Sequence, residues 1–117
     1  MLGAALAFLA VALGAFGAHA LKTRLTPDDA AIWDTAVQYH GWHALAILAC
    51  GLVMQSRPEA GAVAVAAWLF VAGVVLFSGS LYALALGAPR GIGAVTPIGG
   101  VAFLAGWAAF AWGAWRA

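Results

Sequence analysis

Three histidines are the residues of this sequence with the most recognisable chemistry. His40 and His43 stand three apart in "AVQYHGWHAL", residues 36–45, and His19 ends an earlier apolar run. Residues three apart on a helix lie on neighbouring faces, so the two imidazoles are expected to point toward one partner. Neutral imidazole binds zinc, copper, nickel and haem iron. One hypothesis is therefore a metal or haem site made of His19, His40 and His43.

Two other functions compete with metal binding for these histidines. Their spacing lacks the second fixed ligand pair of a zinc motif, and Asp34 would be a fourth ligand only if its helix bent. Polar groups inside a membrane need hydrogen-bond partners whether or not they have a function, so the same residues can serve to join helices. Small multidrug antiporters also have four helices, but they need an acid within the membrane. The 4 acids here fall at or outside the apolar runs.

An enzyme is not expected from these residues. Ser78 and Ser80 can approach a histidine, but the sequence has no glycine-flanked nucleophile elbow and no acid placed to orient a base. Cys50 lies alone in an apolar run, which excludes an intramolecular disulfide and a cysteine metal motif, and it is expected to be a small buried hydrophobe. The formal net charge of +1 gives no basic patch for nucleic acid. The residues identify no cofactor.

The composition is that of a membrane protein. Of the 117 residues, 66% are hydrophobic and 8% are charged, whereas about a quarter of the residues in soluble domains are charged. A soluble fold this small would have too much surface to cover with so few charges. The first apolar run ends in a possible signal-cleavage site, but it lacks a positive n-region and is long, so we expect a retained transmembrane helix. The lipid bilayer is the expected environment.

Four uncharged runs are long enough to cross the membrane. About 30 Å of hydrocarbon takes roughly 20 helical residues, and the runs cover residues 2–21, 35–55, 60–86 and 98–115. The sequence therefore predicts an all-α, polytopic membrane protein, a single domain of residues 1–117 folded as a four-helix transmembrane bundle.

Two connections have recognisable local signals. Thr26 is a good N-cap and Pro27 suits the first helical position, so the second helix is expected to start near residue 27. Residues 27–34 should then lie at the interface, with Trp33 as an aromatic anchor. Glycines and prolines make residues 87–100 a predicted loop.

Polar residues within the spans fall in one half of the predicted bundle. Because antiparallel helices alternate in direction, residue number converts to depth at about 1.5 Å per residue. Nearly all these residues then lie near the side of the first and third connections. Besides the histidines, the polar pocket predicted there contains Gln38, Tyr39, Ser78, Ser80, Tyr82 and Thr96. The distribution of basic residues favours an orientation with both termini outside. The side of the first and third connections has Lys22, Arg24 and Arg90, and the opposite side has Arg57 and Arg116.

Four segments resemble the YgdD-like family of small bacterial inner-membrane proteins, which has eukaryotic relatives. They are "VALGAFGAHALK", "YHGWHALAIL", "SGSLYALAL" and "GAVTPIGGVAFLAGW", in the family's order and approximate spacing over nearly the whole chain. The resemblance implies a four-span, multi-pass protein of the bacterial cell inner membrane. It implies no reaction, because the family's function is unknown. The residues in the family-like blocks are Gly14, Gly17, His19, Tyr39, His40, His43, Ser78, Gly79, Ser80, Tyr82, Thr96, Pro97 and Gly99.

The function expected from the sequence is that of a small structural or accessory membrane subunit with a polar histidine, serine and tyrosine cluster. Small residues recur at every fourth position in Ala10, Gly14 and Ala18, which suits close helix contact within the bundle or between subunits. A homo-oligomer or a larger membrane complex is therefore an expected partner. A metal- or haem-binding protein and a small transporter or channel stay open as alternatives.

Overall fold

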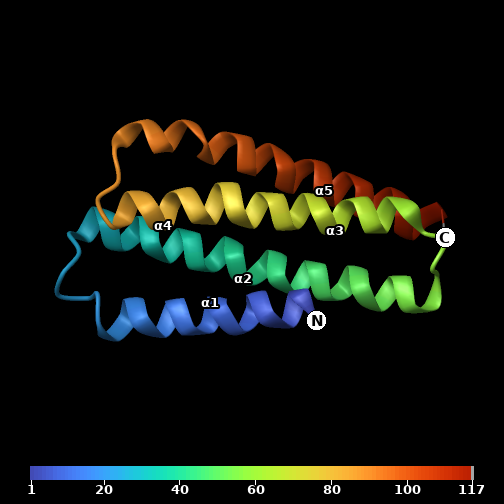
Figure 1. Cartoon of the computed structure of the whole chain (residues 1–117), viewed down its shortest axis with the longest axis horizontal. Helices are drawn as coiled ribbons and strands as arrows, with labels where there is room; N and C mark the ends of the chain where they lie inside the picture. The colour runs from blue at the N-terminus through green and yellow to red at the C-terminus, as the bar shows by residue number, and fades with distance from the viewer. Residues whose placement is uncertain (117) are drawn as a thin grey trace.

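The computed structural model describes residues 1–116, and every regular element in that range is a helix (Figure 1). Four rods form the molecule, and α3, η1 and α4 follow one another without a break as the third rod. This arrangement confirms the prediction of an all-α, four-helix bundle. The elements are α1 (Leu2–His19), α2 (Pro27–Ser56), α3 (Gly61–Gly73), the π-helix η1 (Val74–Ser78), α4 (Gly79–Ala85), the 3₁₀-helix η2 (Arg90–Ala94) and α5 (Thr96–Arg116).

The rods are arranged side by side in chain order, as a row (Figure 1). α1 contacts α2, α2 contacts the third rod, and the third rod contacts α5, while α2 and α5 touch only slightly. The chain accordingly extends 48 × 27 × 16 Å. α1 and α5 are therefore edge helices, and each leaves much of its surface outside the protein interior.

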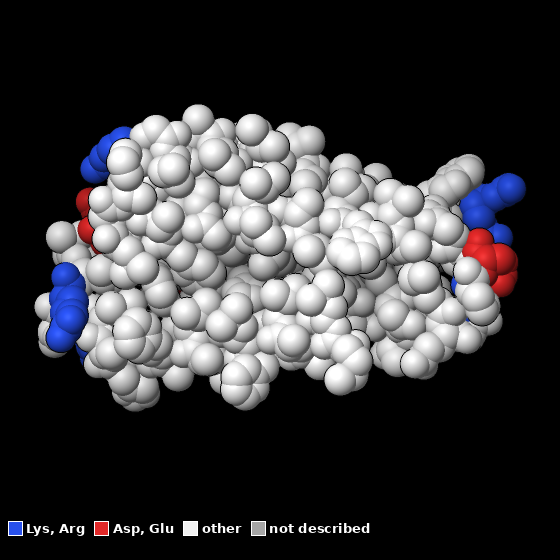
Figure 2. All heavy atoms as spheres, in the orientation of Figure 1, with Lys and Arg blue, Asp and Glu red and all other residues white. Residues whose placement is uncertain are grey.

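Charged residues lie at the two ends of the long axis, where the helices end, and the face between them in Figure 2 is uncharged. Three stretches are long and apolar enough to cross a membrane, namely Leu2–His19, Gly61–Ala85 and Arg90–Arg116. The predicted span 35–55 belongs to α2, which is not among them because its first half is rich in polar residues. α2 lies between α1 and the third rod (Figure 1), and within the bundle its polar residues His40 and His43 are buried. We treat α2 as the fourth spanning helix.

The start of α2 agrees with the sequence prediction, but the position of Trp33 in this helix does not. The helix begins at Pro27, and the Thr26 hydroxyl accepts a hydrogen bond of 3.1 Å from the Asp29 backbone N–H. Trp33 is only 3% exposed, and its indole N–H donates to the carbonyl of Leu13 in α1 at 3.0 Å. The prediction of an interfacial anchor is therefore wrong, because α1 covers this turn of α2.

The predicted loop 87–100 is shorter than expected. α5 begins at Thr96, so the last two glycines of the segment are helical. A Cβ atom on Gly99 would lie 2.8 Å from the carbonyl carbon of Leu76, closer than side chains tolerate. Gly99 therefore permits a close approach of α5 to the third rod, whereas the glycines and prolines predicted a loop there.

The apolar core lies where α2, α3 and α5 meet. Val63, Phe70 and Cys50 are fully buried there, and Phe103 is 4% exposed. The expectation that Cys50 is a small buried hydrophobe is confirmed. This core holds α2 against the two rods that carry most of its polar partners.

Candidate functional site

His43 of α2 is held by hydrogen bonds at both ring nitrogens. Nδ1 lies 2.7 Å from the backbone carbonyl oxygen of Tyr39, and the indole Nε1–H of Trp107 in α5 donates to Nε2 at 3.0 Å. Because an indole N–H can only donate, Nε2 must be the unprotonated acceptor. Nδ1 therefore carries the proton and donates it to the Tyr39 carbonyl. His43 is a neutral imidazole with no lone pair left for a metal ion.

Aromatic rings surround the same imidazole. Phe103 of α5 stacks on His43 with ring centroids 3.6 Å apart and planes 13° apart, and Phe70 of α3 lies 5.5 Å away. Tyr39 approaches Phe77 of η1 at 4.8 Å. His43 is thus part of an aromatic layer shared by α2, the third rod and α5.

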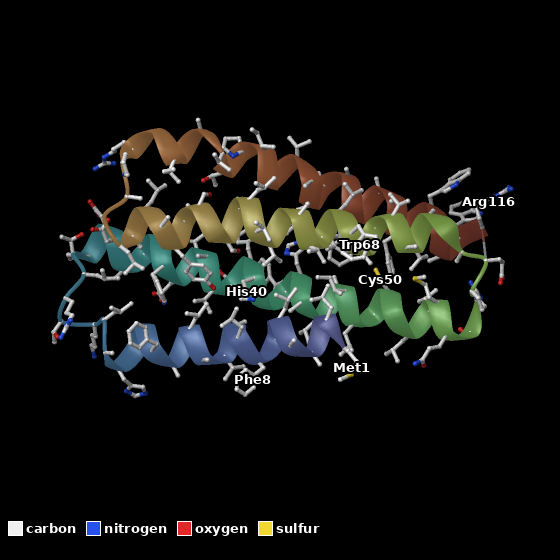
Figure 3. All side chains as sticks on the ribbon, viewed as in Figure 1. Met1, Phe8, His40, Cys50, Trp68 and Arg116 are labelled. Atoms are coloured by element: carbon white, nitrogen blue, oxygen red, sulfur yellow. The ribbon has the colours of Figure 1, made fainter. Side chains whose placement is uncertain are left out.

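His40 has one bonded nitrogen and one unpaired nitrogen. Nδ1 lies 2.9 Å from the Tyr82 hydroxyl of α4, and His40 is 1% exposed. Figure 3 shows the place of His40 along α2. Nε2 is buried and has no hydrogen-bond partner in residues 1–116. The backbone of Leu6 in α1 is a polar neighbour of this imidazole, but it does not meet hydrogen-bonding geometry at Nε2. His40 therefore contributes one link between α2 and α4.

Two serines complete the polar cluster. The Ser78 hydroxyl is fully buried and donates to the carbonyl of Ala36 in α2 at 2.8 Å. The Ser80 hydroxyl donates to the Phe77 carbonyl at 2.9 Å and lies within hydrogen-bonding distance of the Thr96 hydroxyl at the start of α5. These contacts join the third rod to both of its neighbours.

The π-helix η1 is located at this cluster. Its five residues, Val74–Ser78, end at the serine that bonds α2. A π segment changes the rotation of the residues that follow it relative to a regular α-helix, and such segments are frequent at functional sites. In this protein, η1 sets the rotation of α4 and hence the directions of Ser80 and Tyr82.

The two histidines of α2 have different partners. His40 bonds to α4 and His43 bonds to α5. The expectation of one shared partner is wrong, because residues three apart on an α-helix differ in direction by about 60°. That difference is enough to aim the two rings at two separate rods.

The three histidines do not form one site. His19 is the last residue of α1 and is exposed, whereas His40 and His43 are buried. Within residues 1–116, no group of three histidine, cysteine, aspartate or glutamate side chains is arranged to hold a metal ion. Asp34 is also exposed. The structure does not bring His19, His40 and His43 together, because equal depth in two helices does not give a shared direction.

Gln38 also lies outside the cluster. It is exposed and lines an otherwise largely apolar groove of about 600 Å³ between α1 and α2, beside Gly14 and Trp42. Residues two apart on a helix do not face each other, so Gln38 points away from His40. The other predicted pocket residues, Tyr39, Ser78, Ser80, Tyr82 and Thr96, lie together as described above.

Sequence reasoning missed two features of the cluster. Trp107 is the donor that fixes His43, and η1 is the irregular turn that aims α4. Trp107 lies at a depth similar to that of His43 by residue count, and tryptophan carries a donor that needs a partner when buried. No sequence signal for η1 is evident to us.

Comparison with known proteins identifies relatives over most of the chain. The family model described as "Protein of unknown function (DUF423)" matches residues 13–100. The chain is 47% identical over 107 residues to UPF0382 membrane protein YwdK of Bacillus subtilis strain 168, covering 92% of this chain and 87% of that protein. It is 44% identical over 115 residues to UPF0382 inner membrane protein YgdD of Escherichia coli K12, covering 93% and 82%. No solved structure matches the chain.

These relatives confirm the family resemblance and the location in the membrane. The region matched by the family model contains the hydrogen-bonded residues of the cluster except Trp107, and the stacked Phe103 also lies outside it. The relatives are named membrane or inner membrane proteins, in agreement with a multi-pass protein of the bacterial inner membrane. The chain belongs to the UPF0382 (DUF423) family of membrane proteins of unknown function.

Proposed function

We propose that the protein is a small structural or accessory subunit of the inner membrane. The observation that carries this proposal is that the buried polar side chains bond from one helix to another. His43 bonds to Trp107, His40 to Tyr82, and Ser78 to the Ala36 carbonyl. Lipid offers these groups no alternative partners, so such bonds stabilise helix association by about 0.6 to 2 kcal/mol each.

We also propose that the protein is not an enzyme. A serine nucleophile needs a base within hydrogen-bond reach. The hydroxyls of Ser78 and Ser80 donate to backbone carbonyls, and neither bonds to a histidine. His43 has both nitrogens engaged. These contacts give each polar group a structural use.

Metal binding and transport have less support than a structural function. One nitrogen, Nε2 of His40, is buried and unpaired, and a metal site needs several ligands. Five hollows of residues 1–116 take their walls from residues other than His40, His43, Ser78, Ser80 and Tyr82. His40, His43, Ser78 and Ser80 are also buried, which supports a cluster without access for solutes.

The arrangement of the rods supports association with other chains. In the most apolar stretch of each rod, the buried share of the residues is 11% for α1 and 17% for the stretch that contains α5, against 33% for the third rod. Helix faces at the ends of the row are free to contact a second copy or a larger membrane complex. Where no other protein covers the outer faces of α1 and α5, lipid does.

Photo-cross-linking in native membranes tests the proposed subunit function. A benzophenone side chain would replace Phe8 on α1 or Leu104 on α5, which are 78% and 73% exposed on the edge helices. The control is Val75 in the third rod, which is 63% exposed in the middle of the row. We expect discrete protein adducts from at least one edge position and lipid adducts alone from Val75.

Two results would overturn the proposal. One is lipid adducts alone from both edge positions. The other is stoichiometric metal or haem in the untagged purified protein that disappears when His40 is replaced by alanine. A separate flux assay in liposomes tests transport, and a flux abolished by the same substitution would replace the structural proposal with a transport function.

A further inference from the structure

A hollow lies at one end of the bundle, between the end of α1, the connection to α2 and the start of α2. Its volume is about 290 Å³, close to the lower limit of about 300 Å³ for small-molecule sites. Its size suits a headgroup rather than a whole lipid. The apolar part of its lining includes Leu21, Leu25 and Trp33, and the charged part is Lys22 and Asp34.

The two charged residues border the uncharged parts of α1 and α2. Lys22 is the first charged residue after α1, and Asp34 is the last acid before the uncharged part of α2. Asp34 follows the start of α2 at Pro27 by about two turns, so its carboxylate lies deeper than the helix end. A carboxylate at this position can pair with a cation that approaches from outside the protein.

Lys22 and Asp34 are both exposed, and they do not pair with each other within residues 1–116. They stand on two segments that border one hollow. A cation and an anion left unpaired on one small hollow form a complementary site for a ligand with both signs of charge.

The apolar side of the hollow is held in place. Trp33 is 3% exposed and is bonded to the Leu13 carbonyl at 3.0 Å. A Cβ atom on Gly17 would clash with the Trp33 indole, so glycine is what lets α1 approach it. Leu21 is buried, and its carbonyl accepts bonds from the backbone N–H groups of Arg24 and Leu25. The hollow is therefore a built feature of the fold.

We propose that this hollow binds the headgroup of a phospholipid with a primary ammonium group. The phosphate lies at the Lys22 ammonium, and the lipid ammonium donates charge-assisted hydrogen bonds to the Asp34 carboxylate. Leucines beside them contact the glycerol end. A quaternary ammonium cannot donate such bonds, and phosphatidylglycerol has no cation, so phosphatidylethanolamine is the preferred lipid. The site is independent of the polar cluster and of its proposed function.

Native mass spectrometry of the detergent-solubilised full chain, titrated with defined lipids, tests the site. The probes are phosphatidylethanolamine, phosphatidylcholine and phosphatidylglycerol with identical acyl chains. We expect phosphatidylethanolamine to bind about tenfold more tightly than the other two. Asp34→Asn should abolish that preference, Asp34→Glu should retain much of it, and Lys22→Gln should weaken all three lipids.

Matched controls separate the hollow from general charge effects. Asp28→Asn and Arg24→Gln change charges at the same end without lining the hollow, and they should leave the preference unchanged. Equal binding of the three lipids, or equal effects of Asp28→Asn and Asp34→Asn, would overturn the proposal. Excess soluble phosphoethanolamine should not displace the lipid, and efficient displacement would reject the lipid as the source of this chemistry. Helical content by circular dichroism confirms that each variant is folded.

Discussion

Nε1 of Trp107 lies 3.0 Å from Nε2 of His43, and this contact between α5 and α2 fixes the protonation state of a buried imidazole. The indole is 45% exposed, yet its single donor is turned inward to the histidine. Trp107 thus presents an apolar ring to lipid and a polar atom to the bundle. The bond connects helices that touch only slightly elsewhere.

Nitrogen NMR should reveal one tautomer of His43. Because Nε2 accepts from the indole, we expect a protonated Nδ1 and an unprotonated Nε2 for this residue. Loss of the signals in His43→Gln assigns them. A proton on Nε2 would contradict the described geometry.

Replacing Tyr82 alone should lower the free energy of unfolding more than replacing His40 and Tyr82 together. Tyr82→Phe leaves His40 buried without a partner at either nitrogen, so we expect the free energy of unfolding to fall by about 1 to 3 kcal/mol. His40→Leu combined with Tyr82→Phe removes both polar groups and should recover much of that loss. Reversible unfolding in mixed micelles gives the values. A double variant as unstable as the sum of the single variants would contradict the pairing.

Ser78→Ala should lower the free energy of unfolding by about 0.6 to 2 kcal/mol, because it removes a buried bond from η1 to α2. Ser56→Ala is the matched control, since Ser56 is exposed and bonds to a carbonyl of its own helix. Its effect should stay within about 0.5 kcal/mol. Equal effects at the two serines would show that the link between helices has no special value.

Alanine substitution at Gly99 and at Gly51 should change the free energy of unfolding in opposite directions. Gly99→Ala places a methyl group against the Leu76 backbone and should lower the free energy of unfolding by about 1 to 3 kcal/mol. A methyl group on Gly51 in α2 would meet nothing within 4 Å, so Gly51→Ala should raise the free energy of unfolding by about 0.5 to 1 kcal/mol. The same unfolding assay compares them. Destabilisation of similar size at both sites would contradict the close approach of α5.

Local signals and depth were readable from the sequence. Thr26 and Pro27 predicted the start of α2, because capping depends on residues that are adjacent in the chain. The depth count placed Ser80 and Thr96 near each other, since antiparallel helices of regular rise bring equal depths together. These features depend on helix length and direction alone.

The rotation of each helix about its own axis could not be predicted from the sequence. α1 is apolar on all sides, so its sequence does not indicate that His19 faces outward while Ala10 faces α2. In α2, Gln38 and His40 were assigned to one pocket by depth, although two residues apart on a helix means nearly opposite directions. The π-helix η1 adds a further change of rotation that no residue pattern indicated.

The most direct test of the polar cluster as a link between helices is a double-mutant cycle on His43 and Trp107. His43→Leu, Trp107→Phe and the double variant would each be unfolded reversibly in mixed micelles beside the wild type. A coupling energy of about 0.6 to 1.7 kcal/mol is the predicted result, as found for interhelical hydrogen bonds in membranes. A coupling energy indistinguishable from zero would contradict the claim that this bond holds α2 to α5.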